Sequence, residues 1–393
     1  MIGINLVVLC NVDLSQKWGD YTRVFSLMNS LAKRGHNVSI FVVRPEKKYP
    51  SIVSIKENFL NVVEIHPRFT IFSGKKGVGK YLNYILCIPA ILKEFSTINK
   101  KSKINFVYSY MPGIGSSLPA MILKLRYGIK HILDFADLHV FVRPKIIANK
   151  SFKDADIIIA ITDYLRNDLL KRGIDAKKIH IIPNGVNLEL FDPDKYDSSE
   201  IEKLRKSFNA DKLVIFSGAL QDLNLIINSA KQVITNVPKT KFIILGDHRS
   251  PIKSKEAWEK IVHDRGLNEY FIFLGKKPRE EVPKYLFCAD VCIDSFPNEP
   301  YYAAAHPIKL LEYGACAKPV VATIVSETEK IVKHGIYGFL TNPSDPIEFA
   351  HYVTTLLNSK ETCEKLGKEF SNYIRDNFSW DKIALDLEKI LLN

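Results

Sequence analysis

The chain has 393 residues, of which 46% are hydrophobic and 25% are charged. This length exceeds one ordinary domain, and the composition excludes a fibrous, low-complexity or disulfide-stapled protein. The formal net charge of +12 lies entirely in the first half. Residues 1–190 carry 28 basic against 14 acidic side chains, whereas residues 191–393 carry 27 against 29. The first half therefore predicts an anionic partner, such as a membrane surface, a phosphorylated substrate or a nucleic acid.

The cysteines and the apolar segments predict the cellular compartment of the protein. The six cysteines include no Cys-x-x-Cys pair and lie mostly in apolar runs, which favours a reducing cytoplasm. The start, MIGINLVVLC, has neither a basic region nor a small-residue cleavage site, so we expect a first strand instead of a signal peptide. The apolar stretch at residues 81–92 is too short to span a bilayer. We expect a cytoplasmic protein.

Short apolar runs alternate with helical patterns along the whole chain. In the first half, a helix is expected at 21–36, and strands are expected at 4–10, 37–43, 104–110, 130–136 and 156–162. In the second half, a helix is expected at 222–235, and strands are expected at 212–219, 241–247, 270–275, 291–296 and 319–323. Nearly continuous apolar runs are typical of parallel strands that are buried on both faces. The pattern predicts an α/β protein with two doubly wound, Rossmann-like domains.

The domain boundary is expected in the polar, turn-rich stretch at 187–200. We therefore predict an N-terminal domain at 1–190 and a C-terminal domain at 191–377, followed by an amphipathic helix at 378–393. Two such domains would face each other across a cleft, with ligands bound beyond the carboxyl ends of the strands.

Two weaker motifs favour ordinary structural roles. GKKGVGKY at 74–81 approaches a phosphate-binding loop, but Tyr81 stands where a small hydroxyl should bind Mg²⁺. Lysines flank an apolar helical run over residues 75–103, which fits either docking on anionic lipid or a solvated helix packed on the sheet. The Asp-x-Asp at 154–156 precedes a strand, and no other cluster has metal-ligand spacing, so no metal site is expected.

The segment HPIKLLEY at 306–313 carries the clearest chemistry. Pro307 is favoured as the first residue of a helix, with His306 at its cap. The free backbone N–H groups of such a helix start attract a diphosphate, and Lys309 adds a full charge in the first turn. The carboxylate of Glu312 could accept two hydrogen bonds from a ribose diol. The alternative for Glu312 is a surface salt bridge.

Several segments occur together in the order typical of one enzyme family. They are IIPNGVNLELFDP, KLVIFSGAL, FIILGD, FIFLGKKPREEVPKYLFCADVCIDSFPNE, HPIKLLEYGACAKPVVAT, ETEKIVKHGIYGFL and FSWDKIA. The chain resembles the family-4 retaining glycosyltransferases of GT-B fold, in a variant with Pro307, Lys309, Glu312 and Tyr313 in a Pro-x-Lys-x-x-Glu-Tyr pattern. The resemblance implies that the second domain binds a nucleotide-sugar and that residues 378–393 cross back to the first domain.

The resemblance also implies site residues. The donor nucleotide-sugar would be bound by Gly218, Gly275, Lys276, Glu299, His306, Pro307, Ile308, Lys309 and Glu312. The expected catalytic residues are Lys309, Asp137 and His139, and the expected acceptor or phosphate loop contains Gly19 and Arg23.

Two departures from the family pattern bear on activity. The Arg and Lys that usually follow the glycine equivalent to Gly218 are absent from GALQDLNLI, and Ala136 stands where a His is common. Lys309, the helix start, Arg23 and His139 then remain to stabilise the leaving diphosphate. The resemblance implies a retaining, metal-independent and cofactor-free transfer of sugar to a lipid-linked or cell-surface glycan, with no nucleic-acid partner. The alternatives are a catalytically impaired GT-B scaffold subunit and another GT-B enzyme, such as a sugar-nucleotide epimerase.

Overall fold

The chain folds into two compact units. The computed structural model describes residues 3–15, 19–48, 50–70, 78–138, 144–248, 250–325 and 327–393. Unit 1 comprises Met1–Asn184 and Trp380–Asn393, and unit 2 comprises Gly185–Ser379. The boundary precedes the expected one at 190–191 because Val186 pairs with Ser379 and donates its N–H to Phe378 O at 2.8 Å.

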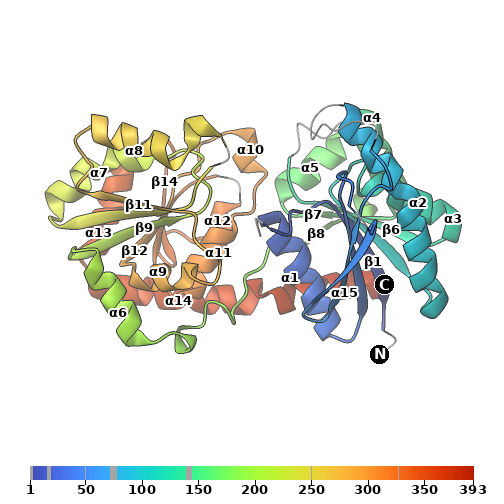
Figure 1. Ribbon diagram of the computed structural model, residues 1–393. Coiled ribbons are helices and arrows are strands. Elements are labelled where there is room, and N and C mark those ends of the chain that lie inside the picture. Colours follow the sequence, from blue (N-terminus) through green and yellow to red (C-terminus); the bar gives the residue numbers. More distant parts are fainter. Residues whose placement is uncertain are drawn as a thin grey trace. The chain divides into compact units, whose positions relative to one another are not determined.

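Unit 1 is built on a mostly parallel sheet with the strand order β3-β4-β2-β1-β5-β6-β7-β8 (Figure 1). Its strands are β1 (Asn5–Cys10), β2 (Asn37–Val43), β3 (Ile52–Glu57), β4 (Leu60–Ile65), β5 (Phe106–Tyr110), β6 (Lys130–Phe135), β7 (Ile157–Ala160) and β8 (Ile179–Ile181). β3 runs antiparallel to β4, and the other neighbouring pairs are parallel.

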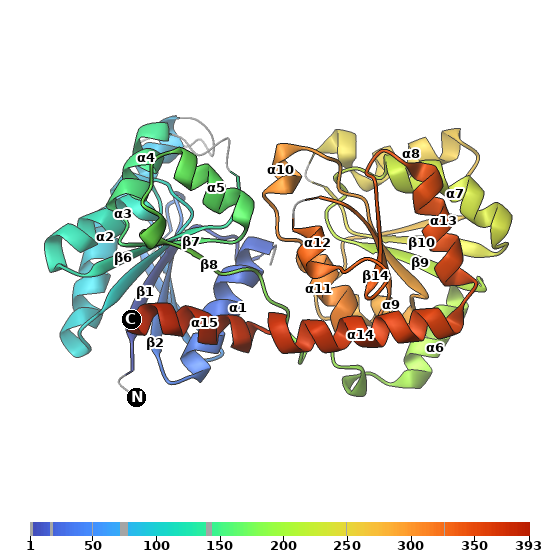
Figure 2. The ribbon, with the colours of Figure 1, turned by 180° about the vertical axis from the view of Figure 1, so that it is seen from behind.

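The helices of unit 1 include the end of the chain. They are α1 (Gly19–Lys33), α2 (Val78–Lys101), α3 (Ser117–Tyr127), α4 (Lys145–Asp154), α5 (Asp163–Lys171) and α15 (Trp380–Leu392). Figure 2 shows α15 in red against α1 in blue. Ser30 Oγ donates to Asp381 Oδ1 at 2.7 Å, and Arg34 Nε donates to Glu388 Oε2 at 2.8 Å. The last helix is therefore part of the first unit.

Unit 2 contains a parallel sheet with the strand order β11-β10-β9-β12-β13-β14. Its strands are β9 (Lys212–Ser217), β10 (Thr240–Leu245), β11 (Phe271–Gly275), β12 (Val291–Asp294), β13 (Val320–Thr323) and β14 (Gly338–Thr341). Its helices are α6 (Ser198–Ser207), α7 (Asn224–Asn236), α8 (Lys255–Asp264), α9 (Val282–Cys288), α10 (Pro300–Ala303), α11 (Ile308–Ala315), α12 (Thr328–Ile331), α13 (Pro346–Leu357) and α14 (Lys360–Phe378). Both units are therefore Rossmann-like α/β domains.

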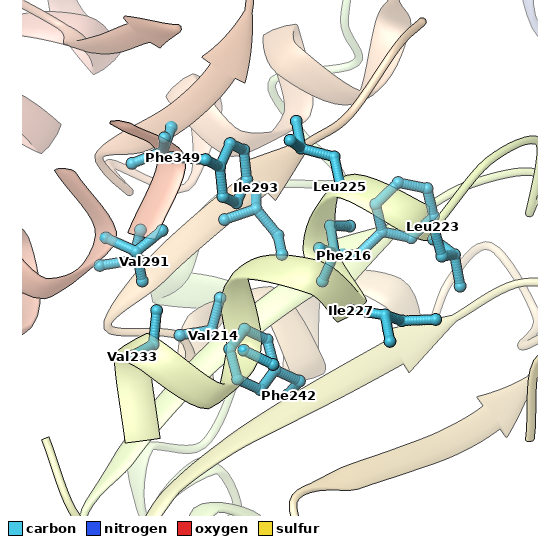
Figure 3. Close-up of a cluster of buried hydrophobic side chains, with 14 of the residues drawn as sticks. Val214, Phe216, Leu223, Leu225, Ile227, Val233, Phe242, Val291, Ile293 and Phe349 are labelled. Carbon is cyan, nitrogen blue, oxygen red and sulfur yellow. The ribbon is translucent and has the colours of Figure 1, made fainter. Parts of the chain in front are cut away.

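Strand β9 is buried on both faces, as its continuous apolar run predicts. Val214 and Phe216 belong to the cluster in Figure 3, which packs the sheet against α7 and α13. Leu213 and Ile215 point into the opposite cluster, which includes residues of α9, α11 and α14. This packing fixes the carboxyl end of β9 in the middle of the sheet.

The structure differs from the sequence predictions at the β3–β4 hairpin, at strand β14, which was not predicted, and at the start of helix α11. The hairpin β3–β4 was not predicted, and its turn places Asn58 at a φ of 52°. Helix α11 begins at Ile308, with Pro307 as its N-cap at φ −74° and ψ 104°, one position later than predicted. In the described part of the chain, each helix is too short or too polar to cross a membrane.

Candidate functional site

Three neighbouring strands of unit 2 end in glycines with positive φ at their carboxyl edge. Gly218 follows β9 with a φ of +141°, Gly246 follows β10 with +133°, and Gly275 ends β11 with +66°. The N–H of Gly218 donates to Leu245 O at 2.9 Å, and the N–H of Gly246 donates to Gly275 O at 2.9 Å. Glycine tolerates these dihedral angles and lets a ligand approach the backbone closely.

The contact between two of these glycines leaves no room for a side chain. A Cβ on Gly246 would lie 1.8 Å from Gly218 O. Gly218 and Gly275 were predicted site residues, whereas Gly246 was missed, although it follows an apolar strand in FIILGD. We call Gly218, Gly246 and Gly275 the glycine edge.

Lys309 lies against the glycine edge and is enclosed. Its Nζ donates to Asp294 Oδ1 at 2.9 Å, and its side chain is 11% exposed. The same ammonium lies 4.2 Å from the ring centroid of Phe216 and 4.6 Å from that of Phe296, within cation–π range. A Cβ on Gly218 would lie 3.0 Å from Lys309 Cε. Asp294 therefore neutralises the charge of Lys309, the lysine that was predicted to bind the diphosphate.

Glu312 makes a different contact from the predicted ribose contact. Its Oε1 accepts a hydrogen bond from Arg279 Nη2 at 2.6 Å, and its side chain is 7% exposed. In this ion pair the Glu312 side chain is buried. The alternative prediction from the sequence was a salt bridge of Glu312 at the surface. Arg279 comes from the loop after β11 and was not predicted as a site residue. The chain itself thus provides one partner for this carboxylate.

Tyr313 fixes helix α11 to the ends of two strands. Its hydroxyl accepts from the N–H of Ser217 at 2.8 Å and donates to Ile293 O at 3.2 Å. Burial raises the pKa of Tyr313 well above its ordinary value, so the phenol remains a neutral hydrogen-bonding group. Helix α11, with Lys309 and Glu312, is therefore held at the carboxyl ends of β9 and β12.

The other predicted donor residues of unit 2 lie at the start of α11, after β11 and at the start of α10. Ile308 is the first residue of α11, and His306 is buried, with its ring centroid 5.7 Å from that of Phe378. Lys276 follows Gly275 at an exposed position. Glu299 is the exposed N-cap residue of α10.

Arg23, which was predicted in an acceptor or phosphate loop, lies in the core of unit 1. Its guanidinium is 2% exposed and forms a bidentate pair with Asp134 at 2.8 and 2.9 Å. Its remaining N–H groups donate to Ile182 O, Pro183 O and Asn184 Oδ1. All five donors of the guanidinium are used, so none is left for a phosphate.

The other residues predicted in unit 1 lie near the starts and ends of its elements or outside the described residues. Gly19 is exposed and begins α1, and Asp137 is partly buried shortly after β6. His139 lies outside the described residues. Of the Asp-x-Asp pair, Asp154 contacts His131 Nδ1 at 3.2 Å and Asp156 accepts from Lys124 Nζ at 2.9 Å. Within the described ranges, no group of three or more His, Cys, Asp or Glu side chains could hold a metal ion.

Family models match both units. Residues 21–190 match the model for Glycosyltransferase Family 4, and residues 197–372 match the model for Glycosyl transferases group 1. An uncharacterized glycosyltransferase of Methanocaldococcus jannaschii is 26% identical over 63% of this chain and 60% of its own length. A D-inositol 3-phosphate glycosyltransferase of Corynebacterium efficiens is 25% identical over 63% of this chain and 58% of its own length. The matches thus span about three fifths of these two relatives.

The fold is shared with a solved structure along nearly the whole chain. Anabaena HepE in complex with UDP-glucose superposes with a TM-score of 0.69 and 16% identity, covering 99% of both chains. At this identity the likeness shows the fold alone. Because family models match both Rossmann-like units, the chain belongs to the glycosyltransferases of GT-B fold.

Proposed function

We propose that the chain transfers a sugar, with retention, from a nucleotide-sugar donor to a lipid-linked or cell-surface glycan. The observation that carries this proposal is the glycine edge of unit 2, with Lys309 and Glu312 of α11 fixed beside it. Backbone without side chains, next to a helix start, suits a diphosphate. The HepE structure, which contains UDP-glucose in the same fold, supports a nucleotide-sugar as the donor.

The roles in donor binding follow from charge. Breaking the bond between sugar and phosphate leaves negative charge on the diphosphate, which preorganised donors must stabilise. The N–H groups of the first turn of α11, which follow Pro307 and begin at Ile308, and the ammonium of Lys309 would supply that stabilisation. Glu312 would accept hydrogen bonds from the ribose diol and share its carboxylate with Arg279.

The acceptor side of the proposal concerns unit 1. Asp137 and His139 would contact the acceptor hydroxyl, while the leaving phosphate takes the proton of that hydroxyl on the same face of the sugar, which gives retention. The reaction would need neither a metal nor another cofactor. The Corynebacterium relative is named as a D-inositol 3-phosphate glycosyltransferase, and an anionic acceptor would match the basic first half of this chain.

The membrane part of the proposal concerns helix α2. Lys93, Lys100 and Lys101 are exposed on this helix, and Lys103 is exposed just after it. Helical spacing places Lys93, Lys100 and Lys101 on one side. We propose that this surface contacts anionic lipid at the membrane face where the acceptor is held.

A donor panel tests the proposed function. The purified chain is mixed with the UDP-, GDP-, ADP- and TDP-sugars, and thermal shift and donor hydrolysis are measured in parallel. We expect one nucleotide class to raise the melting temperature and at least one of its sugars to be hydrolysed slowly. If no donor binds and none is hydrolysed, the proposal fails.

A scaffold subunit is the second candidate function. It is favoured by the charge balance beside the glycine edge, where Asp294 pairs with Lys309 and Glu312 with Arg279. Nucleotide binding without hydrolysis or transfer of any sugar would support this candidate over the transferase.

A further inference from the structure

One oxygen of Asp294 is buried without a donor. Asp294 is the last residue of β12 and is 1% exposed. Its Oδ1 accepts from Lys309 Nζ at 2.9 Å and from the N–H of Ser295 at 3.0 Å. Among the residues that the structure describes, no donor reaches its Oδ2. Since a buried charge with unused acceptor capacity is unfavourable, stability alone does not explain a carboxylate at this position.

The carboxylate is rigid, whereas the lysine is flexible by nature. Strand β12 pairs with β13 at Asp294, opposite Ala322, so the backbone of Asp294 is held in the sheet. Lysine reaches its partner through four rotatable carbon–carbon bonds, and ordering them opposes the contact. The rings of Phe216 and Phe296 and the backbone of Gly218 surround the ammonium that Asp294 holds.

The loops that follow β9 and β12 are joined to each other beside this pair. Ser295 Oγ donates to Asp222 O at 2.8 Å, and Tyr302 Oη lies 3.4 Å from Gln221 Oε1. These loops begin at the glycine edge and at Asp294. The position of the lysine is thus set from the sheet, and hydrogen bonds tie the two loops to each other.

We propose that Asp294 is a positioning residue, which acts on a bound donor through Lys309. Its carboxylate holds the ammonium against Gly218, so that the diphosphate of a donor meets the positive charge in one fixed place. The negative charge of Asp294 also opposes that of the diphosphate. Asp294 therefore weakens nucleotide binding and increases turnover. This inference rests on the proposed function.

The test is a double-mutant cycle of Asp294→Asn and Lys309→Met, with turnover and UDP affinity measured for all four proteins. Asp294→Asn keeps the shape of the side chain and removes its charge. We expect kcat to fall by about tenfold to a hundredfold, the scale of a displaced catalytic group. We expect the Kd of UDP to stay the same or to decrease. In the Lys309→Met background, Asp294→Asn should leave kcat unchanged, because the residue through which Asp294 acts is gone. The Kd of UDP should still decrease there, because the substitution removes a negative charge that opposes the diphosphate.

A structural role predicts other results. If Asp294 only stabilises the fold, Asp294→Asn lowers the melting temperature, weakens UDP binding and lowers turnover together, in both backgrounds. That outcome overturns the proposal. If Asp294→Asn does not yield folded protein, Asp294→Ser takes its place in the same cycle.

A second measurement does not depend on activity. Reductive methylation followed by peptide mass spectrometry gives the rate at which the amine of Lys309 reacts, with Lys360, whose side chain is 85% exposed, as the internal reference. We expect Asp294→Asn to accelerate methylation of Lys309 and to leave Lys360 unchanged. An unchanged rate at Lys309 overturns the positioning role. If the parent neither binds nor hydrolyses any donor, the proposed function fails, and the methylation rate still decides whether Asp294 positions Lys309.

Discussion

At the scale of single residues, the charged groups beside the glycine edge are paired with one another. Lys309 contacts Asp294, and Glu312 contacts Arg279. Removing one partner of a buried pair leaves the other charge uncompensated, which costs more than the pair itself contributes. A mutation at one of these positions therefore needs a control that distinguishes the loss of a ligand contact from the loss of the ion pair.

Glu312→Gln tests the ribose contact. The amide can donate to or accept from a hydroxyl, but it loses the charge that strengthens the hydrogen bond. We expect UDP binding to weaken by ~1.5–3 kcal/mol, the scale of a hydrogen bond to a charged group. Isothermal titration calorimetry with UDP measures this change in binding free energy.

The control for Glu312→Gln is Arg279→Gln, which breaks the same ion pair and leaves the carboxylate intact. If Glu312 binds the ribose, Arg279→Gln should not reproduce the loss of affinity. Equal losses in the two variants would show that the ion pair, and not a ribose contact, sets UDP affinity. Unchanged affinity in Glu312→Gln would also exclude the contact.

At the scale of elements, the carboxyl ends of β9 and β10 depend on a backbone contact. Gly246→Ala would place Cβ 1.8 Å from Gly218 O, so the two strand ends must move apart. We expect a loss of about 2–5 kcal/mol in the free energy of unfolding, from combined overpacking and backbone strain. Urea denaturation followed by circular dichroism measures this loss.

Gly266→Ala is the matched control for this clash. Gly266 also has a positive φ, +68°, but a Cβ there meets nothing within 4 Å. It should lose only about 1–2 kcal/mol, the strain of a left-handed alanine. If both substitutions lower the free energy of unfolding by similar amounts, the ends of β9 and β10 can move apart at little cost, and the clash at Gly246 does not determine stability.

The attachment of α15 predicts a pH dependence. Burial raises the pKa of Glu388, but hydrogen bonds from Arg34 and His36 outweigh burial, and the pKa lies below its ordinary value. A lowered carboxyl pKa stabilises the folded state above the ordinary glutamate pKa of about 4.3, and this contribution is lost as the pH falls through the lowered value. Urea titrations of the parent and Glu388→Gln between pH 7 and pH 3 should therefore converge on acidification. A constant difference would contradict this assignment.

The sequence predicts most of the parallel strands, because they are apolar runs such as β9, which is buried on both faces. The β3–β4 hairpin was missed because IVSIKE at the sheet edge mixes charged and apolar residues. Lys309 and Glu312 could be selected by their places after Pro307. Their partners Asp294 and Arg279 could not be selected from the sequence. Asp294 is 15 residues from Lys309 and Arg279 is 33 residues from Glu312, and only the folding of the sheet brings each pair together.

At the scale of the whole molecule, the positive charge is unevenly distributed along the chain. Residues 1–190 hold 28 basic against 14 acidic side chains, whereas the rest of the chain is close to neutral. Arg23 shows that part of this charge is structural, since it is buried against Asp134. Within the described part of the chain, the exposed lysines Lys93, Lys100 and Lys101 of α2 form no ion pair, and they carry the case for an anionic surface.

Lipid vesicles test that case with the full chain. We expect it to sediment with phosphatidylglycerol vesicles at low salt and to be released as salt is raised, because each surface lysine contributes about 1 kcal/mol through a screened field. The triple variant Lys93→Glu, Lys100→Glu and Lys101→Glu should abolish sedimentation. The matched control converts Lys231, Lys365 and Lys368, exposed lysines of unit 2, to Glu with the same change in net charge. If both triple variants lose binding equally, net charge alone holds the chain on the vesicle, and α2 is not the contact surface.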